Sequence, residues 1–143
     1  MAKPNPCVGL VICYDYLFES EKRKGREEGQ KPRPSAVIVA PAGQSENTVL
    51  ICAITHTKPD DERDGVLISP ADRRWMGLDN KPQWVITDEC NLVDWDDAGI
   101  IPVPDTGDWT YGNMTAELGK EVQASAMKNL GEKRLMIISR LPN

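Results

Sequence analysis

Two adjoining stretches decide the fold: a charged loop, Gly25-Arg-Glu-Glu-Gly29-Gln-Lys-Pro-Arg33-Pro34, and an apolar run of strand length, Ser35-Ala-Val-Ile-Val-Ala40. Glycine adopts backbone conformations that are closed to other residues, and the residue before a proline is held extended. The pattern therefore predicts a loop that delivers the side chain of Arg33 to the start of a strand. A guanidinium group presents a planar fork of donors, which suits a phosphate.

A second apolar run, Thr48 to Ile54, follows after residues 41–47, which have the composition of a wide turn. Two such runs predict an antiparallel hairpin. The hairpin brings Arg33, at the start of one strand, level with Thr55, at the end of the next. His56 comes directly after Thr55, and the alternation of side chains along a strand places it on the other face.

The remaining elements are predicted from apolar periodicity and from capping residues. Further strands are expected at residues 7–18, 65–68 and 83–87, a capped helix at 69–77, a C-terminal helix at 115–129, and either a strand or a docked tail at 136–138. The apolar face of the C-terminal helix is assigned to Leu118, Val122, Ala126 and Leu130. Residues 19–34 are predicted to form a long functional loop with at most one helical turn, at 19–24.

This order of elements predicts one domain over residues 1–143, mainly β with flanking helices, built on a small curved antiparallel sheet or barrel. Residues 94–110 carry acidic side chains together with Pro102, Pro104 and Gly107. They are expected to form an acidic loop insertion without regular structure.

Composition limits the function classes. The chain has 143 residues, of which 40% are hydrophobic and 27% charged, as in an ordinary globular protein. No run is long enough to span a membrane, and the N-terminus lacks the apolar core of a signal peptide, so we expect a cytoplasmic protein. A net charge of −5 argues against coating nucleic acid by bulk attraction, although the 22–33 segment is locally basic.

The four cysteines, Cys7, Cys13, Cys52 and Cys90, are scattered and accompany a single histidine. Zinc and other metals are therefore not expected, and no cofactor is predicted. Three of these cysteines lie in or beside apolar runs and are interpreted as core residues of a reducing compartment. Trp84, Trp95 and Trp109 could stack on bases, but single tryptophans are more often core or partner-binding residues.

An arginine, a hydroxyl and an imidazole at one end of a sheet suit the cleavage of RNA. In that reaction the 2′-hydroxyl attacks its own phosphate, and Arg33 with the Thr55 hydroxyl would stabilise the charge that develops on the phosphate oxygens. Each residue also has a plain structural interpretation. Arg33 could pair with an acidic residue of the loop, Thr55 could simply complete the strand, and His56 could be exposed.

The loop into Arg33-Pro34 with its following strand, Ile54-Thr55 closing the hairpin, Thr87-Asp88-Glu89 at a strand end and the C-terminal helix resemble the MazF/PemK/Kid toxins of bacterial toxin–antitoxin systems. The PemK-like plasmid-maintenance proteins are the most similar branch. The resemblance covers about Val8 to Val93 and, less closely, the last helix. It departs at Gly9-Leu10, where family members usually carry an acidic residue after the glycine.

The resemblance implies an SH3-like barrel that forms a homodimer, cleaves single-stranded RNA without metal and is silenced by a cognate antitoxin protein. It carries the catalytic arginine and threonine of the family onto Arg33 and Thr55. Arg26, Lys31, His56 and Asn91 then become candidate RNA contacts, with Asn91 expected just past the strand at 83–87. The alternative is a non-catalytic interaction module on the same barrel, similar to a gyrase inhibitor or to a degenerate toxin, because one fold hosts many functions.

Overall fold

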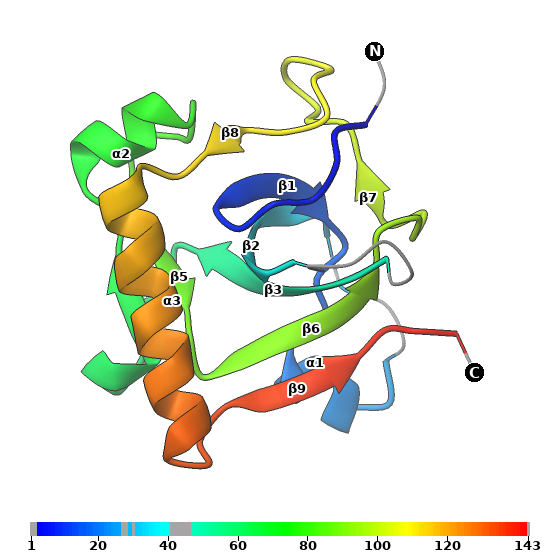
Figure 1. Cartoon of the computed structure of the whole chain (residues 1–143), viewed down its shortest axis with the longest axis vertical. Helices are drawn as coiled ribbons and strands as arrows, with labels where there is room; N and C mark the ends of the chain where they lie inside the picture. The colour runs from blue at the N-terminus through cyan, green and yellow to red at the C-terminus, as the bar shows by residue number, and fades with distance from the viewer. Residues whose placement is uncertain (1–2, 27–28, 30, 41–46, 143) are drawn as a thin grey trace.

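The computed structural model describes residues 3–26, 29, 31–40 and 47–142, which fold around one mainly antiparallel sheet with helices at its margins (Figure 1). The strands are β1 (Leu10–Tyr14), β2 (Arg33–Val39), β3 (Thr48–Thr55), β4 (Gly65–Leu67), β5 (Trp84–Ile86), β6 (Glu89–Asp94), β7 (Ile100–Ile101), β8 (Gly112–Asn113) and β9 (Met136–Ser139). The helices are α1 (Glu19–Arg23), α2 (Pro70–Trp75) and α3 (Ala116–Gly131), with a short 3-10 turn, η1, at Glu62–Asp64. The expected mainly β architecture with flanking helices is confirmed.

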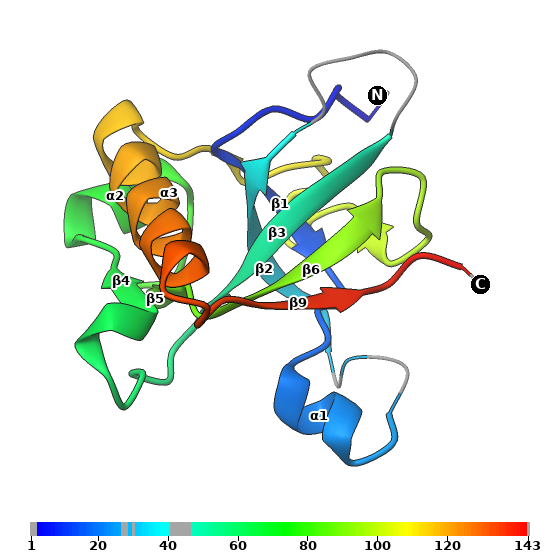
Figure 2. The same ribbon diagram turned by 60° about the horizontal axis from the view of Figure 1, so that its bottom comes forward.

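The strand order is β4-β5-β3-β2-β1-β7, with β6 and β8 pairing to β3 and β1 off this path. Strand β3 has two partners along one edge, because its first half pairs with β6 and its last two residues pair with β5. The last strand, β9, runs parallel to β6, and both views show the two side by side (Figures 1 and 2). Among the described strands no pairing joins β4 to β7, so the sheet does not close on itself.

The predicted hairpin is present as β2 and β3. Ser35 lies opposite Ala53 and Val37 opposite Ile51 in an antiparallel register. Continuing the register by two residues places Arg33 opposite Thr55, as the sequence predicts. The turn is predicted at residues 41–47, of which 41–46 lie outside the described part of the chain.

The hairpin strands read as continuous apolar runs because both of their faces are buried. Val37 and Ala53 belong to one core cluster, together with Trp95. Their neighbours Ala36 and Cys52 point to the opposite face, where a second cluster packs against α3. Burial on both faces removes the alternation of apolar and polar residues that a half-exposed strand would show.

Helix α3 is capped by Thr115, whose hydroxyl accepts the N–H of Leu118. The predicted apolar face is confirmed at Leu118, Val122 and Ala126, but Leu130 is 48% exposed and Asn129 is buried in its place. At about 100° per residue, Asn129 lies about 20° from Leu118 around the helix, whereas Leu130 lies about 120° away. None of the described helices is long and apolar enough to cross a membrane.

Three expectations about the elements need correction. The first strand is shorter than residues 7–18 and ends at Tyr14, because Leu17 leaves the sheet to bind Asn91. Asn91 does not follow a strand but lies within β6. The acidic segment 94–110 is not a loop without regular structure: β7 lies within it and pairs with β1, and Trp95 and Val103 are buried. Its apolar residues tie it to the core in spite of the prolines.

Candidate active site

A cleft of about 470 Å³ opens where the start of β2, the end of β3 and the start of β6 meet the regions of α1 and η1. Figure 2 shows α1 projecting from the sheet, well apart from α3. The cleft is lined by Phe18, Ser20, Arg33, Thr55, Thr57, Lys58, Pro59, Asp60, Asp64, Ile86, Asp88 and Glu89. The two residues predicted to be catalytic are therefore brought together in one cleft.

Arg33 holds its guanidinium group against the ring of Phe18, with 4.7 Å between the guanidinium carbon and the ring centroid. Its Nε atom is buried and has no hydrogen-bond partner within the described part of the chain. Burial lowers the pKa of Arg33, while the nearby Glu21 and Tyr16 raise it. An arginine stays charged under such conditions, so the cleft contains a fixed cation with an unused donor.

Thr55 is the last residue of β3 and is partly exposed. Its hydroxyl oxygen accepts the backbone N–H of Thr57 at 3.2 Å. Since a hydroxyl both accepts and donates, the Thr55 hydrogen remains available to a ligand oxygen in the cleft. Side chains two residues apart in a strand share a face, so Arg33 and Thr55 lie on the same face as Val37 and Ala53.

The cleft also carries four carboxyl groups, against the two cations Arg33 and Lys58. The carboxyl groups are those of Asp60, Asp64, Asp88 and Glu89. Asp64 is paired with Arg134 at 2.6 Å. Burial raises the pKa of Asp88, and the negative charge of Asp64 raises it further. The site therefore combines two cations, Arg33 and Lys58, with an acidic wall.

Glu89 is the most strongly perturbed carboxyl group of this wall. Its two oxygens accept hydrogen bonds from the Tyr16 hydroxyl and from the backbone N–H of Glu19, each at 3.3 Å. Burial is the main cause that raises the pKa of Glu89 to about 7, and the charge of Asp88 adds to it, whereas both hydrogen bonds lower it. A carboxyl group that titrates near neutrality in a cleft can accept a proton from a substrate hydroxyl.

Three of the candidate RNA contacts lie outside the cleft. His56 is exposed and binds Asp79, with 2.8 Å between Nε2 and the carboxylate oxygen. Arg26 is exposed and lies 3.8 Å from Glu21. Lys31 is exposed as well. Arg26 and Lys31 thus belong to the loop between α1 and β2, which we call the outer loop. Residues 27, 28 and 30 of this loop lie outside the described part of the chain.

Asn91 is fully buried, so the structure does not support it as an RNA contact. The side-chain oxygen of Asn91 accepts the backbone N–H of Leu17, and the side-chain nitrogen of Asn91 donates to the backbone carbonyl of Leu17, both at 2.9 Å. Arg140 also donates to this oxygen at 3.3 Å. Asn91 therefore clamps the segment before α1 onto β6, and it positions Phe18 at the edge of the cleft.

We expect Asn91→Ala to lower the free energy of unfolding by about 2–4 kcal/mol, because both buried backbone groups of Leu17 lose their partner. Chemical denaturation monitored by tryptophan fluorescence measures this loss. Asn80→Ala, at an exposed loop position, is the matched control and should change the value by less than about 0.5 kcal/mol. Equal stability of the two variants would contradict the clamp.

Cys13, Cys52 and Cys90 are buried, as predicted for core residues, while Cys7 is exposed. None of the three tryptophans considered for base stacking lines the cleft. Trp95 is buried with its indole N–H bound to the carbonyl of Pro4. The described residues include no cluster of three or more His, Cys, Asp or Glu side chains that could hold a metal ion.

Of the residues that line the cleft, sequence reasoning identifies Arg33 and Thr55; among those it does not identify, Phe18, Lys58 and Glu89 bear most directly on the site. Phe18 had been assigned to the first strand, so its role as a platform for Arg33 was hidden. Lys58 comes only three residues after Thr55, and this proximity was a usable signal. Glu89 was recognised only as part of a strand end, since its burial depends on contacts with residues 16–19 that are distant in sequence.

A glycine in the loop confirms part of the initial interpretation. Gly25 has a φ of +85°, a left-handed conformation that favours glycine. A side chain at Gly29 would collide with the carbonyl oxygen of Tyr16 and the carboxylate of Asp15. Gly29 is thus packed against the residues that follow β1.

Comparison with known proteins adds no family assignment: no family model matches the chain, and a search of curated proteins finds no match.

Proposed function

We propose that the chain is an endoribonuclease that cleaves single-stranded RNA without a metal ion, with Arg33 and Thr55 at the reaction centre. The observation that carries the proposal is the half-buried guanidinium of Arg33, held on Phe18 with an unused donor and level with the hydroxyl of Thr55. Such preorganised donors stabilise charge that develops on phosphate oxygens.

The reaction follows from the groups in the cleft. The Glu89 carboxylate takes the proton of the ribose 2′-hydroxyl, and the 2′-oxygen forms a bond to the adjacent phosphorus. Arg33 and the Thr55 hydroxyl bind the phosphate oxygens on which negative charge grows. The bond from phosphorus to the 5′-oxygen breaks, and this leaving oxygen keeps the electron pair and takes a proton from water. The products are a 2′,3′-cyclic phosphate and a 5′-hydroxyl end.

The broader proposal rests on the resemblance to the MazF/PemK/Kid toxins. On this proposal the fold is an SH3-like barrel, and the active form is a homodimer. A cognate antitoxin protein inhibits it. Arg26 and Lys31 would guide RNA towards the cleft from the outer loop. His56, bound to Asp79 outside the cleft, would at most contact RNA that extends beyond it.

A second candidate function is favoured by the acidic wall. Four carboxyl groups against two cations form an unusual surface for a polyanion, and they would suit a basic side chain of a protein partner. The cleft would then belong to a non-catalytic interaction module, either of the gyrase-inhibitor kind or a degenerate toxin.

One experiment separates the two functions. Purified protein is incubated in EDTA with a long single-stranded RNA and with DNA of the same sequence. The endoribonuclease proposal expects cleavage of the RNA alone, since the DNA lacks the attacking 2′-hydroxyl. Intact RNA, together with growth arrest on expression without loss of cellular RNA, would favour the interaction module.

A further inference from the structure

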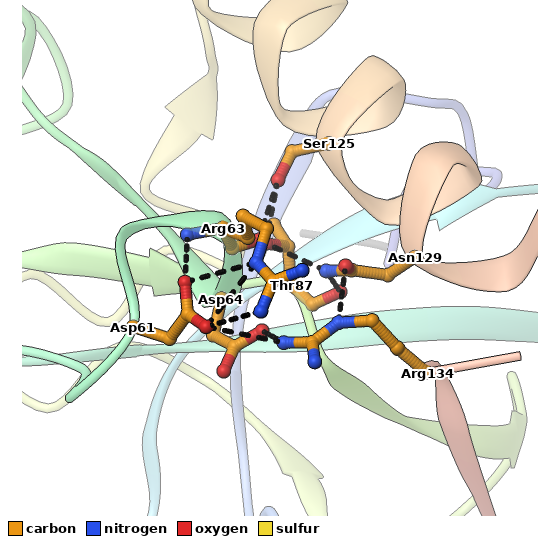
Figure 3. A network of polar contacts seen from close by, with 7 residues as sticks. All are labelled: Asp61, Arg63, Asp64, Thr87, Ser125, Asn129 and Arg134. Carbon is orange, nitrogen blue, oxygen red and sulfur yellow. Dashed lines mark hydrogen bonds and ion pairs between the residues drawn. The ribbon is translucent and has the colours of Figure 1, made fainter. Parts of the chain in front are cut away.

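A polar network centred on the buried Asn129 and Thr87 joins the C-terminal half of α3 to the wall of the cleft (Figure 3). Asn129 is 1% exposed, and its side-chain amide donates to the carbonyl of Arg63 at 3.0 Å and to the carbonyl of Thr87 at 2.9 Å. The Ser125 hydroxyl lies 2.7 Å from that of Thr87. The helix thereby fixes two backbone positions, each of which adjoins a cleft carboxylate: Arg63 precedes Asp64, and Thr87 precedes Asp88.

Arg134 completes the network just after α3. Its guanidinium is 2.6 Å from the carboxylate of Asp64 and 3.7 Å from that of Asp61, and its Nε donates to Asn129 at 3.4 Å. Figure 3 shows the Arg134 side chain reaching towards Asp64 from the side of Asn129. Asp64 lines the cleft whereas Arg134 does not. The arginine thus sits behind the wall, and among the described residues that line the cleft it pairs with Asp64.

The charge of Arg134 matters because the cleft is acidic. Among the causes that act on Asp88, the charge of Asp64 raises its pKa and that of Arg134 lowers it. The electrostatic influence of Arg134 therefore extends to a second cleft carboxylate. Without it, Asp64 would be an unpaired negative charge in a cleft that is proposed to admit a phosphodiester.

We propose that Arg134 is a positioning residue of the cleft: it holds Asp64 in place and offsets its charge, so that a phosphodiester can bind beside Arg33. The inference rests on the proposed function, and it assigns to α3 a role in substrate binding. It also accounts for one of the four carboxyl groups of the cleft, because the charge of Asp64 is offset.

The test is a charge-compensation series. Arg134→Gln is expected to raise KM for RNA about five- to tenfold and to change kcat by less than about twofold, because a binding charge is lost and the reacting groups are untouched. Asp64→Asn in the same chain should bring KM back to within about twofold of the wild type. Asp64→Asn alone should bind RNA at least as tightly as the wild type.

Arg63→Gln is the matched control. Arg63 lies in the same network but pairs through its side chain with Asp61, at 2.6 Å, outside the cleft. Its substitution removes the same charge without leaving a cleft carboxylate unpaired, and KM should stay within about twofold. If Arg134→Gln does not fold, Arg134→Lys replaces it, and this variant should keep KM within about threefold because the charge is retained.

A second measurement separates this inference from the proposed function. Fluorescence anisotropy with a 2′-O-methyl oligonucleotide, which cannot be cleaved, reports binding alone. If the wild type binds it but cleaves no RNA, the proposed function fails, and the Kd values of the same variants still decide the role of Arg134. Wild-type Kd and KM in Arg134→Gln, no recovery on adding Asp64→Asn, or no binding by the wild type would each overturn the inference.

Discussion

Replacing Arg33 with alanine is expected to lower the rate of RNA cleavage by about 10²–10³-fold, because the substitution removes the cation that the proposed mechanism places on the phosphate oxygens. The guanidinium is held against Phe18, so its position is set before the phosphate charge develops. Single-turnover kinetics with a short single-stranded RNA measures the loss. The groups that remain in the cleft, including the Thr55 hydroxyl, Lys58 and Glu89, would support only residual cleavage.

Two further variants serve as controls for Arg33→Ala. Arg33→Lys keeps the charge but not the planar fork, so its rate should lie between those of the wild type and the alanine variant. Arg23→Ala removes an arginine whose side chain is 75% exposed on α1 and pairs with Glu19, and it should cleave at the wild-type rate. Comparable cleavage by Arg33→Ala and Arg23→Ala would remove Arg33 from the mechanism.

The second large effect is expected for Glu89→Gln, which cannot accept the 2′-hydroxyl proton. We expect its cleavage rate at pH 8 to fall by about 10²-fold or more. The wild-type rate should rise as the pH passes through about 7, because the pKa of Glu89 is raised to about 7 and only the carboxylate form accepts a proton. The variant should lose this rise. Glu121→Gln, exposed on α3, should keep the wild-type profile.

The cleavage rate should rise with pH, whereas the free energy of unfolding should fall as the pH rises. The pKa of Glu89 lies above its ordinary value of 4.5 in the folded protein, so the folded state binds the proton more tightly than the unfolded state does. Unfolding free energy should therefore decrease by about 2 kcal/mol between about pH 4.5 and pH 7. Glu89→Gln should remove that decrease. A wild-type stability that rises over this interval would show that the Glu89 carboxylate is not held in a costly environment.

Local patterns were sufficient for most of the fold. The hairpin and its register follow from two apolar runs, each of strand length. The capped helix α2 follows from Ser69 and Pro70. The predictions of secondary structure are wrong where contacts between distant parts of the chain determine the structure. The prolines of segment 94–110 hid β7, which exists because Trp95 and Ile100 are buried against β1 and its neighbours.

The candidate site could be predicted only in part. Arg33 and Thr55 were found because a hairpin fixes their relation without help from the rest of the chain. Asn91, expected to contact RNA, is a buried clamp, whereas Glu89, for which the sequence predicts no role in the site, lines the cleft. The positions of both side chains depend on hydrogen bonds with residues 16–19, about 70 positions earlier in the chain. A local sequence pattern does not predict such long-range contacts.

The most direct test of the central claim is the chemistry of the ends that the protein produces. Mass spectrometry of a single-stranded RNA cut by the purified protein in EDTA identifies both ends at the cleavage site. The account predicts a 2′,3′-cyclic phosphate and a 5′-hydroxyl, formed by the wild type and not by Arg33→Ala. Uncut RNA, or ends with a 3′-hydroxyl and a 5′-phosphate, would contradict attack by the 2′-hydroxyl at the Arg33 cleft.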